Sequence, residues 1–131
     1  MPFGSKRKVS HLRKKLYKFV SILKERIPGL EGLIIMRYDG LVITHVLPEK
    51  VDEYLFSAIA VSIFSVSQKA FNELNYGDLN YIVLHGSKKQ LVISCAGDFI
   101  FCFLASGETK LHFILQGIFE ISQKISELLE I

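Results

Sequence analysis

The stretch IPGLEGLIIMRYDGLVITHVL, residues 27–47, decides the fold, because it ends one helix and then folds back as a pair of strands. Pro28-Gly29 stops helical structure at its start. Two apolar runs follow, residues 32–38 and residues 41–47, with Asp39-Gly40 between them. Such a dipeptide between β-rich runs predicts a tight hairpin in which both central residues take positive φ.

An amphipathic helix precedes this hairpin. Ser10 is its expected N-cap, and residues 1–9 before it are polar and basic and predict a loose N-terminal arm. At 131 residues the chain has the size of one domain, so we expect the arm over residues 1–9 and a single domain over residues 10–131. The apolar face of the helix, at helical spacing, consists of Leu12, Leu16, Phe19, Leu23 and Ile27.

Two more helices and three more strands complete the chain. Asp52 is the expected N-cap of a long middle helix that runs to about Asn75, and Gly77 suits the left-handed residue after its end. Turns at Gly86-Ser87 and Gly97-Asp98 then divide three strands, and an amphipathic stripe indicates a last helix. We expect these strands at residues 79–85, 90–96 and 99–105, and the stripe over residues 111–129.

The sheet order follows from where polar side chains occur. The run FIFCFLA, residues 99–105, is apolar at every position, so this strand should be central and covered on both faces. Residues 32–36 are nearly as apolar and should lie beside it, while the strands that carry Thr44-His45 and Asn80 fall at the edges. We therefore predict an α+β fold, a three-layer α/β/α sandwich with chain order αββαβββα. Its five-stranded antiparallel sheet has the order 2-1-5-4-3, with strands numbered along the chain.

The composition predicts that another molecule covers part of the surface. Half of the residues are hydrophobic and mean hydropathy is +0.32, which is high for a small domain that keeps much of its surface exposed. The longest apolar runs fall short of the ~20 residues that a membrane span needs, so a partner chain is the better explanation. Cys95 and Cys102 lie diagonally on adjacent predicted strands, too far apart for an easy disulfide. We interpret them as free thiols of a reducing cytoplasm.

Helical winding gives the middle helix two apolar stripes that lie side by side and cover about half of its circumference. Either one deep core buries both stripes, or the second stripe packs on the same helix of another copy about a twofold axis. The first stripe is Leu55, Ile59, Ile63, Val66, Ala70 and Leu74. The second stripe is Phe56, Ala60, Phe64, Ser67 and Phe71, and with Tyr81 and Val83 of the edge strand it forms the predicted dimer interface.

Residues 27–36 and residues 39–43, together with the small and apolar middle helix and the last meander, resemble the roadblock/dynein light chain family. The resemblance covers about residues 10–129. It implies dimers that share a continuous sheet, with the middle helices paired on one face. It also implies binding of Ras-like small GTPases on or near that helix pair, by members that act as activators, exchange factors, scaffolds or motor light chains.

We therefore predict a homodimeric protein-binding module that docks a Ras-like small GTPase and regulates or scaffolds it. The third arc of the middle helix, which is mostly small or polar, is the expected docking surface. The alternative is a heterodimerising structural scaffold or light-chain subunit whose basic arm docks on an anionic membrane or a polyanion. Either protein would be cytoplasmic or peripheral at a membrane. The docking residues are Ala58, Val61, Ser65, Lys69 and Asn72.

The start of the chain is strongly basic, because residues 1–18 contain seven lysines and arginines and no acidic residue. They predict a solvated tail or a patch attracted to anionic lipid. Nucleic acid is the least favoured partner, because no aromatic stacking platform is interleaved with the charges. The basic residues are Lys6, Arg7, Lys8, Arg13, Lys14, Lys15 and Lys18.

Sequence motifs for chemistry are absent. The chain has no Walker loop and no G-x-G-x-x-G, and its four histidines lack ligand spacing. We expect no nucleotide, metal or other cofactor, no catalytic residue and no enzymatic activity of its own. Arg37 has two interpretations, an arginine finger supplied in trans and a surface ion pair with Asp39, and the second is favoured.

Overall fold

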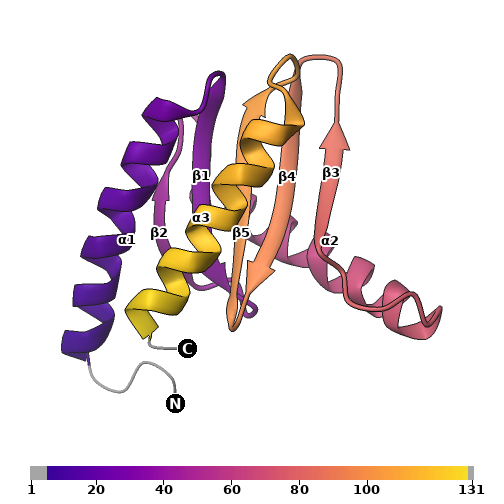
Figure 1. Cartoon of the computed structure of the whole chain (residues 1–131), viewed down its shortest axis with the longest axis horizontal. Helices are drawn as coiled ribbons and strands as arrows, with labels where there is room; N and C mark the ends of the chain where they lie inside the picture. The colour runs from indigo at the N-terminus through magenta and orange to yellow at the C-terminus, as the bar shows by residue number, and fades with distance from the viewer. Residues whose placement is uncertain (1–5, 130–131) are drawn as a thin grey trace.

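The computed structural model describes residues 6–129, with side chains from Ser10 onward, and its elements follow the predicted order αββαβββα. All neighbouring strands pair antiparallel, and their order across the sheet is β2-β1-β5-β4-β3, as predicted (Figure 1). The elements are α1 Lys6–Arg26, β1 Leu30–Arg37, β2 Val42–Val46, α2 Glu53–Glu73, β3 Tyr81–His85, β4 Lys89–Ala96, β5 Phe99–Ser106 and α3 Leu111–Leu129.

Helices cover both faces of the sheet. α1 and α3 lie side by side on one face, and α2 crosses the other (Figure 1). On β5, Phe101 and Phe103 belong to the core under α1 and α3, whereas Ile100 and Cys102 belong to the core under α2. All four side chains are fully buried. The continuous apolar run of this strand therefore fills two cores at once.

The first helix begins earlier than expected. α1 starts at Lys6, so Ser10 lies within the helix and does not cap it. A buried row that includes Leu12, Leu16 and Val20 holds the helix on the sheet, and such packing outweighs a local capping preference. Residues 1–5 of the predicted arm lie outside the described residues, and the division into arm and domain stays a prediction.

The β1–β2 turn has a different geometry from the one predicted. Gly40 has a φ of 89°, but Asp39 does not have a positive φ. Gly40 N–H donates to the Arg37 carbonyl at 2.9 Å, and Arg37 N–H donates to the Leu41 carbonyl at 2.9 Å. This is a type I turn followed by a left-handed glycine, so a single residue takes positive φ.

The residue that follows α2 in the left-handed region is Asn75, with a φ of 57°, rather than Gly77 alone. Tyr76 N–H donates to the Phe71 carbonyl at 3.0 Å, and Asn75 N–H donates to the Asn72 carbonyl at 3.3 Å. These bonds form a Schellman motif, in which asparagine is the usual substitute for glycine. The helix therefore ends at Glu73, four residues before Gly77.

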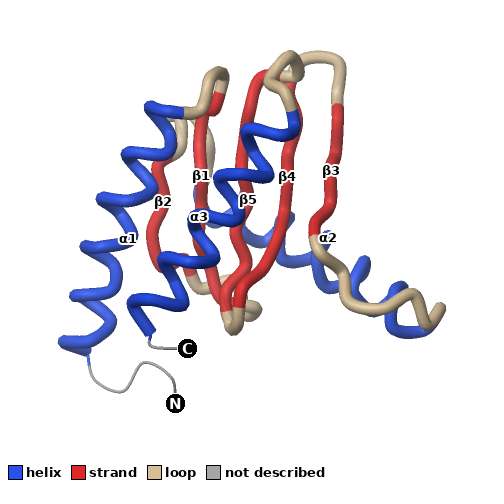
Figure 2. Tube along the Cα trace, in the orientation of Figure 1, coloured by secondary structure: helices blue, strands red, loops and turns tan. Residues whose placement is uncertain are grey.

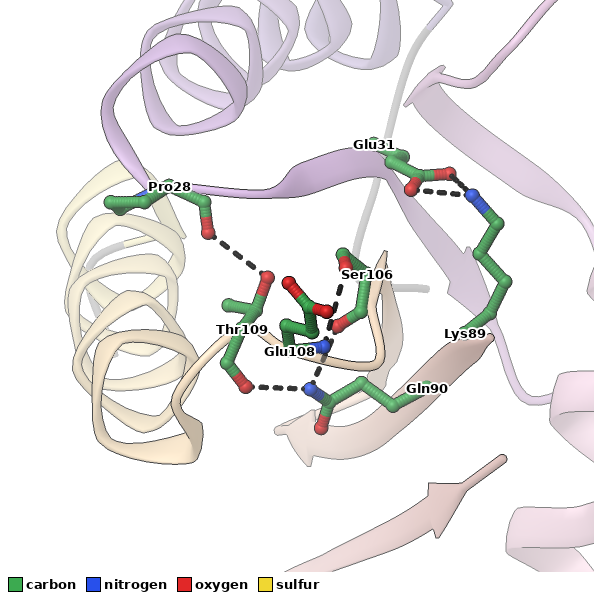
Figure 3. A network of polar contacts seen from close by, with 7 residues as sticks. All are labelled: Pro28, Glu31, Lys89, Gln90, Ser106, Glu108 and Thr109. Atoms are coloured by element: carbon green, nitrogen blue, oxygen red, sulfur yellow. Dashed lines mark hydrogen bonds and ion pairs between the residues drawn. The ribbon is translucent and has the colours of Figure 1, made fainter. Parts of the chain in front are cut away.

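A polar network joins three segments at one end of the sheet (Figure 3). The Gln90 side chain, 3% exposed, donates from Nε2 to the carbonyls of Ser106 and Thr109 at 3.0 and 2.7 Å. Thr109 Oγ1 donates to the Pro28 carbonyl at 3.0 Å, and Lys89 Nζ lies 2.6 Å from a carboxylate oxygen of Glu31. The helix-stopping Pro28-Gly29 is thereby fastened to the loop between β5 and α3.

We predict that Gly29→Ala destabilises the chain more than Gly77→Ala. Both glycines have positive φ, 80° and 90°, so both changes strain the backbone. A Cβ at Gly29 would lie 2.1 Å from Thr109 Oγ1, whereas one at Gly77 meets nothing within 4 Å. Moving Thr109 breaks its bond to Pro28, so the free energy of unfolding should fall by about 1 kcal/mol more in Gly29→Ala. Urea denaturation measures the difference, and equal losses would contradict this reading of the network.

Candidate protein-binding surface

α2 rests on the sheet through one row of its side chains. Ala60 and Phe64 are each 1% exposed. They pack in one cluster with Ile34 and Met36 of β1 and Ile100 of β5. Because the helix is in contact with two central strands through this row, its rotation about its own axis is set there.

The first turn of α2 is fixed by two polar contacts. Asp52 is the N-cap, as predicted, and its Oδ1 accepts hydrogen bonds from the N–H groups of Tyr54 and Leu55 at 2.9 and 3.2 Å. Glu53 Oε2 lies 3.0 Å from His45 Nε2 on β2. The helix therefore begins beside β2 and crosses the sheet from there.

The stripe predicted for the dimer interface lies against the chain's own sheet. Ala60 and Phe64 are buried, and Phe56, Ser67 and Phe71 are half-buried. Both half-buried phenylalanines pack against the same cluster as Phe64. Ala60 and Phe64 are therefore not available to a second copy, whereas contact of Phe56, Ser67 and Phe71 with one stays a prediction. Phenylalanine rings bury more area than Leu, Ile or Val side chains, so this orientation removes more apolar surface from water.

The other apolar stripe of α2 faces outward. Leu55, Ile59, Val66 and Leu74 are 60, 46, 70 and 56% exposed. Full burial of each would contribute about 1.5–3 kcal/mol, which the isolated chain does not gain. Soluble monomers rarely leave contiguous apolar patches in water unless a partner covers them. The excess of apolar surface expected from the composition is therefore located on this stripe.

The outward stripe continues onto the last strand of the sheet. Figure 2 shows α2 crossing behind the sheet, with its final turn beyond β3. β3 is a terminal strand, so its outer backbone groups are available for pairing. Eight of the fourteen exposed large apolar side chains in the described residues lie on α2, on β3 or between them. We call seven of them, without Tyr81, the α2–β3 surface, which consists of Tyr54, Leu55, Ile59, Val66, Leu74, Tyr76 and Leu84.

Two predicted interface residues lie on β3. Tyr81 is 42% exposed, but it shares a strand face with Val83 and so lies on the side of α1 and α3. Val83 is half-buried and packs against the core under α1 and α3. The sequence pattern did not identify Leu84 or Tyr76, because neither belongs to a regular apolar stripe of one element.

The predicted docking arc lies next to the outward stripe. Ala58, Ser65, Lys69 and Asn72 are exposed on α2, as a docking surface requires. Val61 is half-buried and packs against the cluster around Phe64, so little of it is available to a partner. The other four side chains of the arc are small or polar, in contrast to those of the apolar stripe beside it.

α2 is long and apolar enough, by length and composition alone, to cross a membrane. Its outward apolar stripe contributes much of that composition. Withdrawing the helix from the sheet would uncover an apolar face that includes Ile34, Met36 and Ile100. We therefore treat α2 as part of the folded domain.

Within residues 6–129, no group of three or more His, Cys, Asp or Glu could hold a metal ion. Cys95 and Cys102 are both free, and burial raises the pKa of the Cys102 thiol far above its ordinary value. A thiol with a raised pKa stays protonated, and a protonated thiol is a poor nucleophile. Arg37 Nη2 lies 3.7 Å from Asp39 Oδ2, which agrees with the ion-pair interpretation. The expected lack of a cofactor and of catalytic residues stays a prediction.

The basic residues at the start of the chain lie on the opposite side of the sheet. Arg13, Lys14, Lys15 and Lys18 are exposed on α1, which shares its face with α3 rather than with α2 (Figure 1). The side chains of residues 6–8 lie outside the described ones. The basic and apolar surfaces therefore lie mainly on opposite faces of the sheet, and they meet at the β2 edge, where Lys14 of α1 and Tyr54 of α2 line one pocket.

Comparison with known proteins identifies relatives in sequence and fold. The profile of the Roadblock/LC7 domain matches residues 18–105. The uncharacterized protein MJ1340 of Methanocaldococcus jannaschii is 28% identical over 97 residues, which are 74% of this chain and 85% of that protein. MglB of Myxococcus xanthus shares the fold, with a TM-score of 0.83, 12% identity and 90% of each chain covered. A structure of MglB with a tetrameric arrangement shares it too, with a TM-score of 0.80, 10% identity and 90% of each chain covered.

We predict unequal effects for two side chains of α2 that are close in sequence. Phe64→Ala removes a buried ring and should lower the free energy of unfolding by about 3–5 kcal/mol. Val66→Ala shortens a side chain that is 70% exposed and should change it by less than about 0.5 kcal/mol. Chemical denaturation at low protein concentration, where a second copy contributes least, measures both. A loss in Val66→Ala as large as that in Phe64→Ala would mean that the helix is rotated differently.

Proposed function

This chain belongs to the Roadblock/LC7 family, and we propose that it forms a homodimer that docks a Ras-like small GTPase and regulates or scaffolds it. The α2–β3 surface is the observation that carries the proposal. It joins an apolar helix stripe to an open sheet edge, and these are the two elements through which the family resemblance implies pairing. Small-GTPase binding is likewise what that resemblance implies.

A second copy of the chain covers both parts of this surface with one symmetry operation. A twofold axis beside β3 pairs the strand with its mate in the antiparallel sense, which satisfies its outer backbone groups. The same axis brings the outward stripes of the two α2 helices together, with Ile59 and Val66 near the contact. Because the contact is isologous, each side chain that is buried at the interface on one copy is also buried on the other.

The GTPase docks beside the helix pair, on the arc that pairing leaves free. Ala58, Ser65 and Asn72 are exposed and carry short side chains, so a globular partner can approach the helix backbone closely. Lys69 lies on the same arc, is exposed and supplies a positive charge for a carboxylate of the partner. The surface is shallow, which suits a protein partner better than a small molecule.

The effect on the GTPase is positional rather than chemical. The Tyr38 ring packs edge-on against Phe64, with 6.0 Å between ring centres, so the β1–β2 turn lies beside α2. Arg37 at this turn forms an ion pair with Asp39. Stimulation of hydrolysis or exchange would come from holding the GTPase's own residues in place.

We predict that Ile59→Glu combined with Val66→Glu converts a dimer into a folded monomer. Both side chains are exposed in one chain, so the change spares the core, but pairing would bury four carboxylates at the helix contact. Multi-angle light scattering measures the mass, and circular dichroism checks the fold. Gln123→Glu on the exposed side of α3 is the matched control and should remain dimeric.

Two outcomes would contradict this prediction. A double variant that keeps the dimer mass would place the interface elsewhere on the molecule. An unmodified chain that is monomeric, yet pairs with a second Roadblock chain, would favour the heterodimeric scaffold over the homodimer.

We predict that Lys69→Glu weakens binding to the cognate GTPase roughly tenfold, equivalent to about 1.4 kcal/mol, without changing the dimer mass. Ras-like GTPases encoded by the same genome are mixed with the protein in GDP-bound and GTP-analogue-bound states, and calorimetry measures affinity. Lys110→Glu, exposed before α3, is the control and should bind as the unmodified chain does. Absence of association with every such GTPase in both states would remove the docking proposal while leaving the dimer intact.

A further inference from the structure

α1 carries a large excess of positive charge. Between Lys6 and Arg26 its sequence holds nine lysines and arginines and a single acidic residue, Glu25. The helix buries a row of apolar residues on the sheet, so the basic side chains described on it are left toward water. Like charges at helical spacing destabilise a helix, and an anionic surface that neutralises them offsets this repulsion. The charge pattern therefore indicates an anionic partner.

Lysines and apolar side chains share the outside of this helix. Lys14, Lys18 and Ile22 follow one another at four-residue intervals and so form one row along the helix. Tyr17 lies next to this row. Ile22 and Tyr17 are each 53% exposed, and both lysines are exposed as well. The outer surface of α1 is therefore basic and apolar at once.

α3 extends this surface on the same face of the sheet. It lies beside α1 (Figure 1), and Arg26 of α1 forms an ion pair with Glu120 of α3. Phe119 is 60% exposed on α3, although phenylalanine is usually buried. Lys124 Nζ lies 5.8 Å from the ring centre of Phe19 on α1. We define the α1–α3 face as Lys14, Lys15, Tyr17, Lys18, Ile22 and Phe119.

We propose that the α1–α3 face docks the protein on an anionic lipid bilayer. The lysines lie at the headgroup phosphates, and Tyr17, Ile22 and Phe119 reach the boundary of the acyl chains. Lysine suits this role because its long stem lets the charge remain at the headgroups while the methylenes contact apolar material. The binding is that of a peripheral protein, since α1 and α3 stay packed on the sheet when the face contacts the bilayer.

Lipid is the occupant that satisfies both properties of the face. Nucleic acid or an acidic protein would neutralise the lysines but would offer no extended apolar phase to Ile22 and Phe119. The three lysines of the face also present point charges rather than the planar forks with which arginine recognises single phosphates. Diffuse attraction to a charged surface requires no such fork.

This orientation leaves the protein-binding side free. α2 lies on the opposite face of the sheet, so the α2–β3 surface and the docking arc point away from the bilayer (Figure 1). In the proposed homodimer the continuous sheet places both α1 helices on the same side. Two α1–α3 faces would then contact one membrane together, and their affinities would reinforce each other.

Sedimentation of the full chain with lipid vesicles tests the proposal. We expect binding to phosphatidylcholine vesicles that contain phosphatidylglycerol, little binding to phosphatidylcholine alone, and weaker binding as salt rises. Lys14→Ala with Lys18→Ala should weaken binding about 25-fold, at about fivefold for each lysine near the surface. Phe119→Ser should weaken it at high salt as well, because the acyl-chain contact is not screened.

A matched double variant, Lys50→Ala with Lys88→Ala, removes two exposed lysines outside α1 and should bind as the unmodified chain does. Circular dichroism confirms that each variant is folded. Failure to bind the anionic vesicles would overturn the proposal, as would equal losses in the two double variants. Full retention of binding in Phe119→Ser at high salt, or capture of duplex DNA in place of vesicles, would also overturn it. The assay contains no GTPase, so its result is independent of the proposed function.

Discussion

Burial of Phe64 against β1 and β5 is the contact on which the arrangement of surfaces depends. With Ala60 it packs between α2 and the sheet, and both side chains are 1% exposed. A helix can present only one arc to a sheet, so seating the phenylalanine row turns the row of Leu55, Ile59 and Val66 outward. A rotation of the helix that buried the second row would instead expose the rings.

The sheet then separates two chemically different sides. On the α2 side, an apolar stripe runs into the open edge of β3, and a small polar arc lies next to it. On the α1 and α3 side, lysines lie among exposed apolar side chains. A protein with this division can hold a protein partner on one face while the other faces a charged surface. Neither role requires that the protein supply a catalytic group.

Much of the fold was predictable, because a few residues decide which strands are buried on both faces and which lie at the edges of the sheet. FIFCFLA needs cover on both faces and so must be central, which led to the correct sheet order. The rotation of α2 was not predictable, since periodicity reveals two apolar stripes but not which of them packs against Ile34, Met36 and Ile100 of the sheet. The start of α1 was missed because a capping serine is a local signal that tertiary packing overrides. The sequence pattern did not identify Phe119, because hydrophobic periodicity needs several residues and one exposed ring shows none.

Amide hydrogen exchange of the unmodified chain, followed over a range of protein concentrations, tests the central claim most directly. β2 and β3 are both terminal strands, so in a monomer both edges exchange freely with water. If a second copy covers the α2–β3 surface, exchange at Tyr81–His85 should slow as concentration rises, while exchange at Val42–Val46 stays constant. Exchange in β3 that is as independent of concentration as exchange in β2 would contradict the account.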